Sequence, residues 1–396
     1  MSVLILAVIF ISFIAIGLPS SIFGAAWPVM QQDLGVPMSS AGIVSVILSG
    51  GMIVSSLLSG KLMARFRTEW IAVVCIGFTV VSFVGYWRLP SFILISAASL
   101  PLGMVAAANA ALSRFIALNF KSSHMNWTHC FWGVGATLGP IVISIFINRN
   151  NAWRTGFFAV AIIQLTVTAM LLLSFPLWNV FRNGAGADAA IEAKVPITSE
   201  KDAGIVFRIP GLKAVLISFF AYCALEATIG LWGSSYLVNH RNISPDIAAR
   251  WLSAFFIGIT AGRFISGFIA IKIMNRILIR TGLTMAAAGS AAMLLPLPSL
   301  FSMLGLFTIG LGCAPIYPCM LQETPHRFGK EASRSIMGIQ MAFAFMGAAF
   351  MPPLFGLFAS NTNAGVAAFP FFTAIYVLIM IVSSETVNVL TGKKNA

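Results

Sequence analysis

Long apolar stretches separated by short polar segments follow one another along the whole chain. Each is close to the roughly 20 mostly apolar residues that a membrane-spanning helix requires. They are apolar on all sides, whereas the strands of a membrane barrel would alternate apolar and polar positions over about ten residues. The pattern therefore predicts twelve transmembrane helices, at residues 3–27, 40–62, 70–88, 92–117, 126–147, 153–178, 211–237, 248–272, 277–297, 299–321, 334–358 and 365–388.

The composition agrees with an integral membrane protein. Of the 396 residues, 59% are apolar and 9% are charged, whereas soluble domains carry about 25% charged residues. A soluble chain of this length would need far more polar surface to cover its core. We therefore exclude a soluble enzyme, a nucleic-acid-binding module and a disordered scaffold. Met1 and Ser2 supply no basic segment, so we expect the first span to be a helix rather than a cleaved signal.

The placement of Lys and Arg predicts the orientation of the chain. If the N-terminus is cytoplasmic, 18 of the 24 Lys and Arg residues fall in inner segments, five fall in outer segments, and Arg263 lies within a span. Such an excess of basic residues is typical of cytoplasmic segments. We expect both termini to be cytoplasmic in a bacterial inner membrane. The excess also accounts for the net charge of +13 without a nucleic-acid partner.

One long polar stretch, residues 179–210, divides the chain into two halves of six spans. We expect an N-terminal six-helix bundle at 1–178, a cytoplasmic linker at 179–210, and a C-terminal six-helix bundle at 211–396. Small residues recur between the halves at offsets of 207, 209 and 212: Gly51 with Gly258, Leu102-Gly103 with Leu311-Gly312, and Gly135 with Gly347. The recurrence predicts a duplicated, pseudo-symmetric architecture around a central cavity, as transporters often have.

Several short segments resemble those of a known family. Residues 59–69, SGKLMARFRTE, resemble the loop-two signature of the major facilitator superfamily, although Ala64 stands where an acidic residue is usual. Trp153-Arg154 also fits the outer start of its span six. Residues 224–237, 260–267 and 310–329 resemble the fucose–proton symporter branch and its sugar-transporter relatives. The resemblance implies the all-α major facilitator fold, with twelve transmembrane helices in two bundles, and a transporter of sugars.

Two charged residues fall deep within spans. A charge at the membrane centre costs about 2.5–3.5 kcal/mol on insertion scales, so such residues are functional candidates. Glu226 lies near the middle of span seven, and burial of a carboxyl favours its neutral form, which suits a group that loads and releases a proton. Arg263 in span eight is offset from Glu226 by about four residues, which is roughly 6 Å along the helix axis. We expect Arg263 to be its counter-charge. The alternatives are a fixed ion pair that locks helices together, or packing near an inner gate.

Other embedded polar and aromatic residues are candidates for a substrate site. Amides and imidazole can bind hydroxyl groups, and an indole ring can stack on a sugar. The alternatives are satisfied core residues, interhelix contacts and, for the Trp residues, an interfacial belt. The candidates are Asn109, Asn126, His129, Trp132, Tyr222, Trp232, Tyr317 and Gln340. Charged residues at inner span ends, including Glu323 and Arg327, are expected to snorkel to water, with an inner gate as the alternative for Glu323.

No enzyme motif accompanies these residues. HExxH, GxSxG and GxxxxGK[ST] are absent from the sequence, and no cysteine pair has metal-ligand spacing. We expect neither a cofactor nor a metal. A gradient must then supply the energy. The hypothesis is a monomeric, proton-coupled symporter for a small polar solute, a neutral sugar or polyol, working by alternating access. A proton-driven exporter of drugs or metabolites is the second hypothesis, and a transport-inactive receptor or scaffold is the third.

Overall fold

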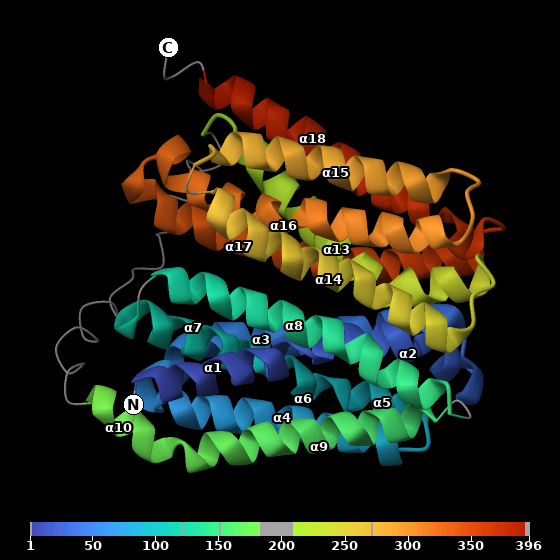
Figure 1. Cartoon of the computed structure of the whole chain (residues 1–396), viewed down its shortest axis with the longest axis horizontal. Coiled ribbons are helices and arrows are strands. Elements are labelled where there is room, and N and C mark those ends of the chain that lie inside the picture. Colours follow the sequence, from blue (N-terminus) through green and yellow to red (C-terminus); the bar gives the residue numbers. More distant parts are fainter. Residues whose placement is uncertain (1, 121, 150–151, 183–208, 271, 393–396) are drawn as a thin grey trace. The chain divides into compact units, whose positions relative to one another are not determined.

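The structure is a computed structural model and describes residues 2–120, 122–149, 152–182, 209–270 and 272–392. These residues form helices joined by short turns, without a strand in the described part (Figure 1). Twelve described helical segments are long and apolar enough to cross a membrane, and each overlaps one of the predicted spans. The prediction of an all-α, twelve-span protein is confirmed.

The chain divides into two compact units, Met1–Val195 with Ile243–Ser253, and Pro196–Asn242 with Ala254–Ala396. The predicted boundaries at residues 178 and 211 stay a prediction, and most of the predicted linker lies outside the described residues. The helices before it are α1 (Ser2–Gly17), α2 (Pro19–Asp33), α3 (Ala41–Arg65), α4 (Thr68–Arg88), α5 (Phe92–Ala97), α6 (Ser99–Gly103), α7 (Val105–Asn119), α8 (Ser122–Ile147), α9 (Trp153–Leu173) and α10 (Phe175–Arg182), with 3₁₀ turn η1 (Met38–Ser40).

The later helices are longer and less interrupted. They are α13 (Leu212–Asn239), α14 (Pro245–Ile269), α15 (Asn275–Leu294), α16 (Leu300–Phe328), α17 (Lys330–Asn361) and α18 (Phe369–Gly392), with 3₁₀ turn η2 (Gly365–Ala368). Within this group α13 packs against α17 and α18, and α15 packs against α16. Ser253 and Ala254, where the two units meet in sequence, both lie within α14.

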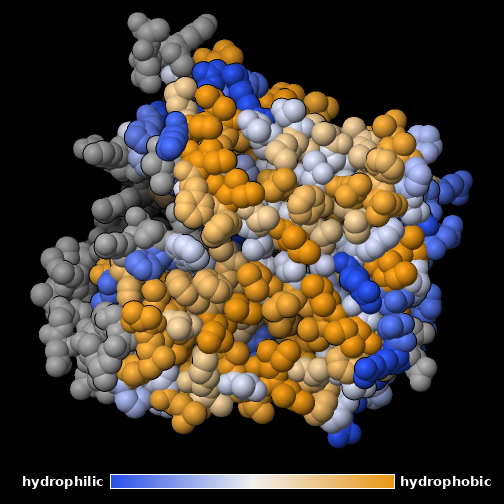
Figure 2. Space-filling view, viewed as in Figure 1, coloured by the Kyte–Doolittle hydropathy of each residue, from blue (hydrophilic) through white to orange (hydrophobic). Residues whose placement is uncertain are grey.

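Apolar side chains cover much of the surface. Figure 2 shows hydrophobic residues over most of the visible face, and hydrophilic residues gathered toward its edges. Leu57 and Leu173 are 77% and 82% exposed. A water-soluble protein would rarely expose apolar area on this scale, whereas a bilayer solvates it. The surface therefore fits a protein that crosses the membrane many times.

Proline breaks the first span, and the freed backbone group finds a partner on another helix. Pro19 has no N–H, so it cannot donate to the carbonyl of Ala15 four residues earlier. The buried amide of Gln164 in α9 donates to that carbonyl over 2.8 Å. In the same way, Pro140 in α8 cannot donate to the carbonyl of Ala136. That carbonyl accepts a 2.5 Å hydrogen bond from the hydroxyl of Ser21. Side-chain donors of this kind must replace the missing backbone N–H where no water can reach the backbone.

Close contacts between helices recur in the two units. A Cβ added to Gly51 of α3 would lie 2.5 Å from the carbonyl oxygen of Leu100, and one added to Gly258 of α14 would collide with the carbonyl oxygen of Phe307. Both members of the second contact lie 207 residues after those of the first. The helices approach this closely because glycine has no side chain. The equal offset supports the predicted duplication.

The contacts correct one detail of the predicted repeat. Gly103 was predicted to correspond to Gly312, but the backbone of Gly103 lies against Gly51, and it is Gly310 that lies against Gly258. Gly312 instead packs against the carbonyl of Gly282 in α15. Two glycines two residues apart in one helix point in different directions, about 200° apart, so the sequence match alone was ambiguous.

A polar cluster fixes the ends of α2 and α9. The Trp153 indole N–H donates to the Asp33 carboxylate over 3.2 Å, and Arg154 lies 3.7 Å from the same group. Arg154 also donates to the carbonyl of Leu89 over 2.8 Å, and its guanidinium lies 4.3 Å from the centre of the Trp153 ring. The Trp-Arg pair noted in the sequence therefore ties the first, third and sixth spans together at one end.

Candidate functional site

One stripe of α13 carries the deeply placed acid. Phe219, Tyr222 and Glu226 lie three and four residues apart, so they share one face of the helix. Tyr222 is only 1% exposed, and Glu226 is partly buried. The hydroxyl of Tyr222 has no hydrogen-bond partner among the described residues. A buried hydroxyl without a partner is costly, so this position can bind a ligand hydroxyl or a water molecule.

Arg263 reaches the same neighbourhood from α14. The preceding residue, Gly262, brings α14 against α16, because a Cβ there would lie 2.5 Å from the Cβ of Ala314. Glu226 and Arg263 both lie close enough to Tyr222 and Tyr317 for their charges to influence the two hydroxyl groups. Both charges also act on the fully buried Cys313 of α16. The structure thus brings together the predicted acid, the predicted base and two of the predicted aromatic residues.

Tyr317 of α16 completes the cluster. Its ring centre lies 5.2 Å from that of Phe219 and 5.4 Å from that of Tyr222. Its hydroxyl lies 2.8 Å from the sulfur of Met341 in α17. Four helices, α13, α14, α16 and α17, therefore contribute to one site that combines aromatic faces, a hydroxyl and two opposite charges. No group of three potential metal ligands lies together among the described residues.

The predicted candidates in the first unit lie on two helices. Asn109 of α7 has a buried side-chain oxygen with no hydrogen-bond partner among the described residues. On α8, Trp132 is partly buried against the core of that unit, and His129 is exposed. Asn126 lies in α8, but its side chain is outside those that the structure describes. A role in substrate binding stays a prediction for these four residues.

Two further candidates have partners within the second unit. Trp232 is fully buried, and its indole N–H donates to the carbonyl of Pro352 over 2.7 Å. Gln340 is also fully buried, and its amide donates to the hydroxyl of Thr324 over 2.9 Å. Both therefore connect α17 to a neighbouring helix. The structure records no contact between either one and Glu226, and their predicted role in the substrate site remains a prediction.

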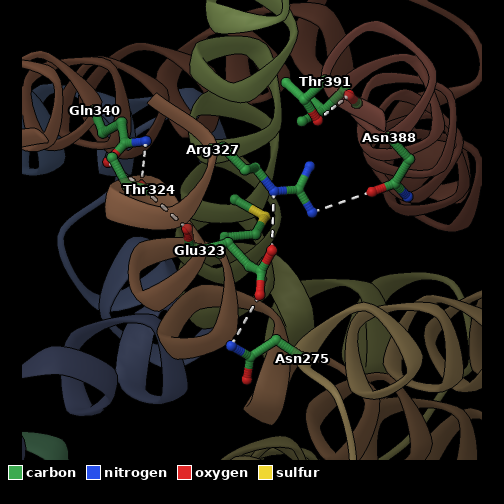
Figure 3. Close-up of polar contacts among 9 residues, drawn as sticks. Asn275, Glu323, Thr324, Arg327, Gln340, Asn388 and Thr391 are labelled. Carbon is green, nitrogen blue, oxygen red and sulfur yellow. Dashed lines mark hydrogen bonds and ion pairs between the residues drawn. The ribbon is translucent and has the colours of Figure 1, made fainter. Parts of the chain in front are cut away.

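A second polar group lies at the end of α16 (Figure 3). Glu323 and Arg327, one turn apart, form a 3.1 Å ion pair and are 23% and 13% exposed. Asn275 at the start of α15 donates to Glu323 over 3.1 Å, and Arg327 donates to Asn388 of α18 over 3.0 Å. Glu323 and Arg327 were expected to snorkel to water; in the structure both are mostly buried, pair with each other and also bind side chains of neighbouring helices. The group joins three helices of the second unit at one end.

This end group is expected to contribute substantially to stability. Replacing Arg327 with Met leaves the Glu323 carboxylate partly buried without its charge partner, which costs about 3 kcal/mol in comparable cases. The exposed pair of Arg280 and Glu385, whose side chains are 51% and 39% exposed, offers a matched control. Arg280→Met should have a much smaller effect, because solvent screens exposed pairs. Thermal unfolding of both purified variants measures the difference, and equal melting temperatures would contradict the assigned role.

Three residues of the site were not among the predicted ones. Phe219 follows from the sequence in retrospect, because it lies three residues before Tyr222 on a helical face. Cys313 lies one turn before Tyr317 and so shares its side of α16. Met341 has no comparable signal, because its contact with Tyr317 depends on how α17 packs against α16.

Comparisons with known proteins identify the family. The sequence profile described as Major Facilitator Superfamily matches residues 9–236 and 214–388. Bypass of stop codon protein 6 of Saccharomyces cerevisiae is 22% identical over 395 residues, which cover 89% of this chain and 76% of that protein. The glucose/mannose transporter GlcP of Bacillus subtilis is 24% identical over 278 residues, which cover 68% of this chain and 66% of that protein.

Solved structures share the fold at low sequence identity. A D-xylose-proton symporter has a TM-score of 0.75 at 15% identity, covering 98% of this chain and 97% of that one. The nucleoside transporter NupG has a TM-score of 0.74 at 12% identity, covering 97% and 98%. A bacterial homologue of the human lysosomal transporter Spinster has a TM-score of 0.72 at 11% identity, covering 99% and 97%.

Proposed function

The chain belongs to the Major Facilitator Superfamily, and we propose that this transporter carries a neutral sugar or polyol together with protons, by alternating access. The observation that carries the proposal is the cluster of Glu226, Arg263, Tyr222 and Tyr317 in the second unit. The cluster belongs to a membrane transporter rather than an enzyme.

The composition of the cluster favours an uncharged, hydroxyl-rich substrate. Its two charges are opposite in sign, so they leave little net charge to hold an ion. Aromatic rings such as that of Tyr317 can stack on the apolar face of a sugar, and the unpartnered hydroxyl of Tyr222 can exchange a hydrogen bond with a sugar hydroxyl. The similarity to a glucose/mannose transporter supports the same substrate class.

The placement of Glu226 supports the proposed proton coupling. When Glu226 is ionised, attraction to Arg263 favours an arrangement of α13 and α14 that holds the two charges near each other. Protonation removes that attraction, so proton binding changes the energy of the site and can be linked to substrate binding. The name of the D-xylose-proton symporter, which shares the fold, is consistent with such coupling.

The first unit also bears on the direction of transport. Its acidic residues among the described ones are Asp33, Glu69 and Asp246, and all three lie near helix ends rather than at depth. Glu69 is 5% exposed and forms an ion pair with Arg67 in the segment between α3 and α4. An exporter that carries its proton on an acid in this unit has no group at depth for it there, and we therefore favour uptake over the export of drugs or metabolites.

We further propose that the protein lies in a bacterial inner membrane as a monomer with both termini in the cytoplasm. The excess of Lys and Arg in the predicted inner segments supports this orientation. A transport-inactive receptor or scaffold would have no use for two opposite charges in its spans, which argues against that alternative.

Sugar counterflow in proteoliposomes tests the substrate class. Unlabelled glucose, mannose, xylose or a polyol should compete with labelled sugar, whereas lipophilic cations should not. Tyr317→Ala should weaken competition by about two- to tenfold, because an aromatic contact is worth about 0.5–1.5 kcal/mol. Tyr317→Phe keeps the ring and serves as the matched control. Competition by lipophilic cations, with no response to any sugar or polyol, would instead support the exporter.

A further inference from the structure

A groove of about 810 Å³ runs between the beginning of α13 and the last half of α18. Its walls are mostly apolar, with two hydroxyl-bearing residues and one lysine. Ser383 and Thr386 are engaged with backbone carbonyls of their own helix. The lining includes Ile217, Leu378, Val382 and Leu390, whose side chains are 45–59% exposed. The size is within the range of ligand sites, about 300–1,000 Å³.

The groove is separate from the site around Glu226. Ile217 precedes Glu226 by nine residues, which is two and a half helical turns, so the two side chains leave α13 on opposite sides. The same spacing separates Lys213 from Tyr222. The groove therefore lies on the other face of α13, and the inference does not depend on the proposed transport function.

One end of the groove is positively charged. Lys213 is exposed, lines the groove and forms no ion pair with a described residue. It lies in the first turn of α13, where no side chain caps the helix, so the positive end of the helix dipole adds to its charge. Among the described residues that line the groove, none has an acidic side chain.

We propose that this groove binds an anionic phospholipid of the surrounding bilayer, with an acyl chain along α13 and α18 and the phosphate at Lys213. Both helices cross the membrane, so the apolar walls face lipid chains rather than water. The charge at the end of the span is at the depth of lipid head groups, where basic residues attract anionic lipids. A zwitterionic lipid fits the apolar walls equally well but gains less from the lysine.

Native mass spectrometry of the purified full-length protein with added phosphatidylglycerol or phosphatidylethanolamine tests this assignment. The wild type should retain phosphatidylglycerol preferentially. Lys213→Gln should reduce the phosphatidylglycerol-bound fraction at least fivefold, whereas Lys272→Gln, at another exposed lysine, should leave it unchanged. Thr386→Trp, which fills the groove from an exposed position, should reduce binding of both lipids. Thr281→Trp on α15 is its control.

Several outcomes would overturn the proposal. Equal retention of the two lipids by the wild type would remove the role of charge, as would equal losses in the two lysine variants. Unchanged binding in Thr386→Trp would place the lipid elsewhere. A dimer mass that disappears in Thr386→Trp, without a change in lipid retention, would show that a second copy of the chain occupies the groove.

Discussion

Gly135→Leu is expected to prevent the protein from folding into a stable form. A Cβ at this position of α8 would collide with the carbonyl oxygen of Ile14 and lie 2.9 Å from the backbone nitrogen of Leu18. The obstacle is backbone, which cannot rotate away as a side chain can, so the two helices would have to separate. The cost should exceed the roughly 1–3 kcal/mol typical of overpacking by side chains. Size-exclusion chromatography of the expressed variant should show little monodisperse protein.

Two further glycine variants complete this test. Gly347→Leu should be equally damaging, because a Cβ there would collide with the carbonyl oxygen of Phe220 in the corresponding contact of the second unit. Gly60→Leu should be well tolerated, since nothing lies within 4 Å of a Cβ at that position. If Gly135→Leu yields as much folded protein as Gly60→Leu, the close packing of α1 against α8 is wrong.

Glu226→Gln is expected to abolish sugar accumulation driven by a proton gradient while preserving sugar exchange. The neutral amide resembles the protonated carboxyl in shape, so the substrate site should remain usable, but it cannot release a proton. Accumulation and exchange are measured separately in proteoliposomes, with and without a pH gradient. Glu385→Gln, at an acid of α18 that is paired with Arg280 outside the cluster, is the control and should retain both activities. Full accumulation by Glu226→Gln would remove Glu226 from the coupling mechanism.

The twelve spans could be predicted because the bilayer imposes their length on the sequence directly. The way in which the first span is interrupted was harder to predict from the sequence. Pro19 indicates a break, but the amide that satisfies the freed carbonyl is Gln164, nearly 150 residues later. Only the packing of α9 against α1 reveals that pairing. For the same reason, Gly310 could not be distinguished from Gly312 as the partner in the repeated contact.

The site, too, was only partly predictable from the sequence. Glu226 and Tyr222 were predictable as neighbours because one helix carries both at a spacing of four residues. The approach of Arg263 depends on a second helix, and the predicted axial offset was enough to propose it. Sequence could not separate polar residues of the site from polar residues that bind helices together. Gln340 and Trp232 have hydrogen-bond partners in other helices, and Glu323 and Arg327 form a polar group of their own.

The most direct test of proton-coupled transport is the pH inside proteoliposomes when sugar is added outside, in the absence of any imposed gradient. A pH-sensitive dye trapped in the lumen reports the proton movement, and counterflow on the same preparation confirms that the protein is active. If sugar and protons enter together, the lumen acidifies with wild-type protein as sugar enters, and Glu226→Gln gives no pH change. Sugar entry through the wild type with a constant internal pH would contradict proton-coupled transport.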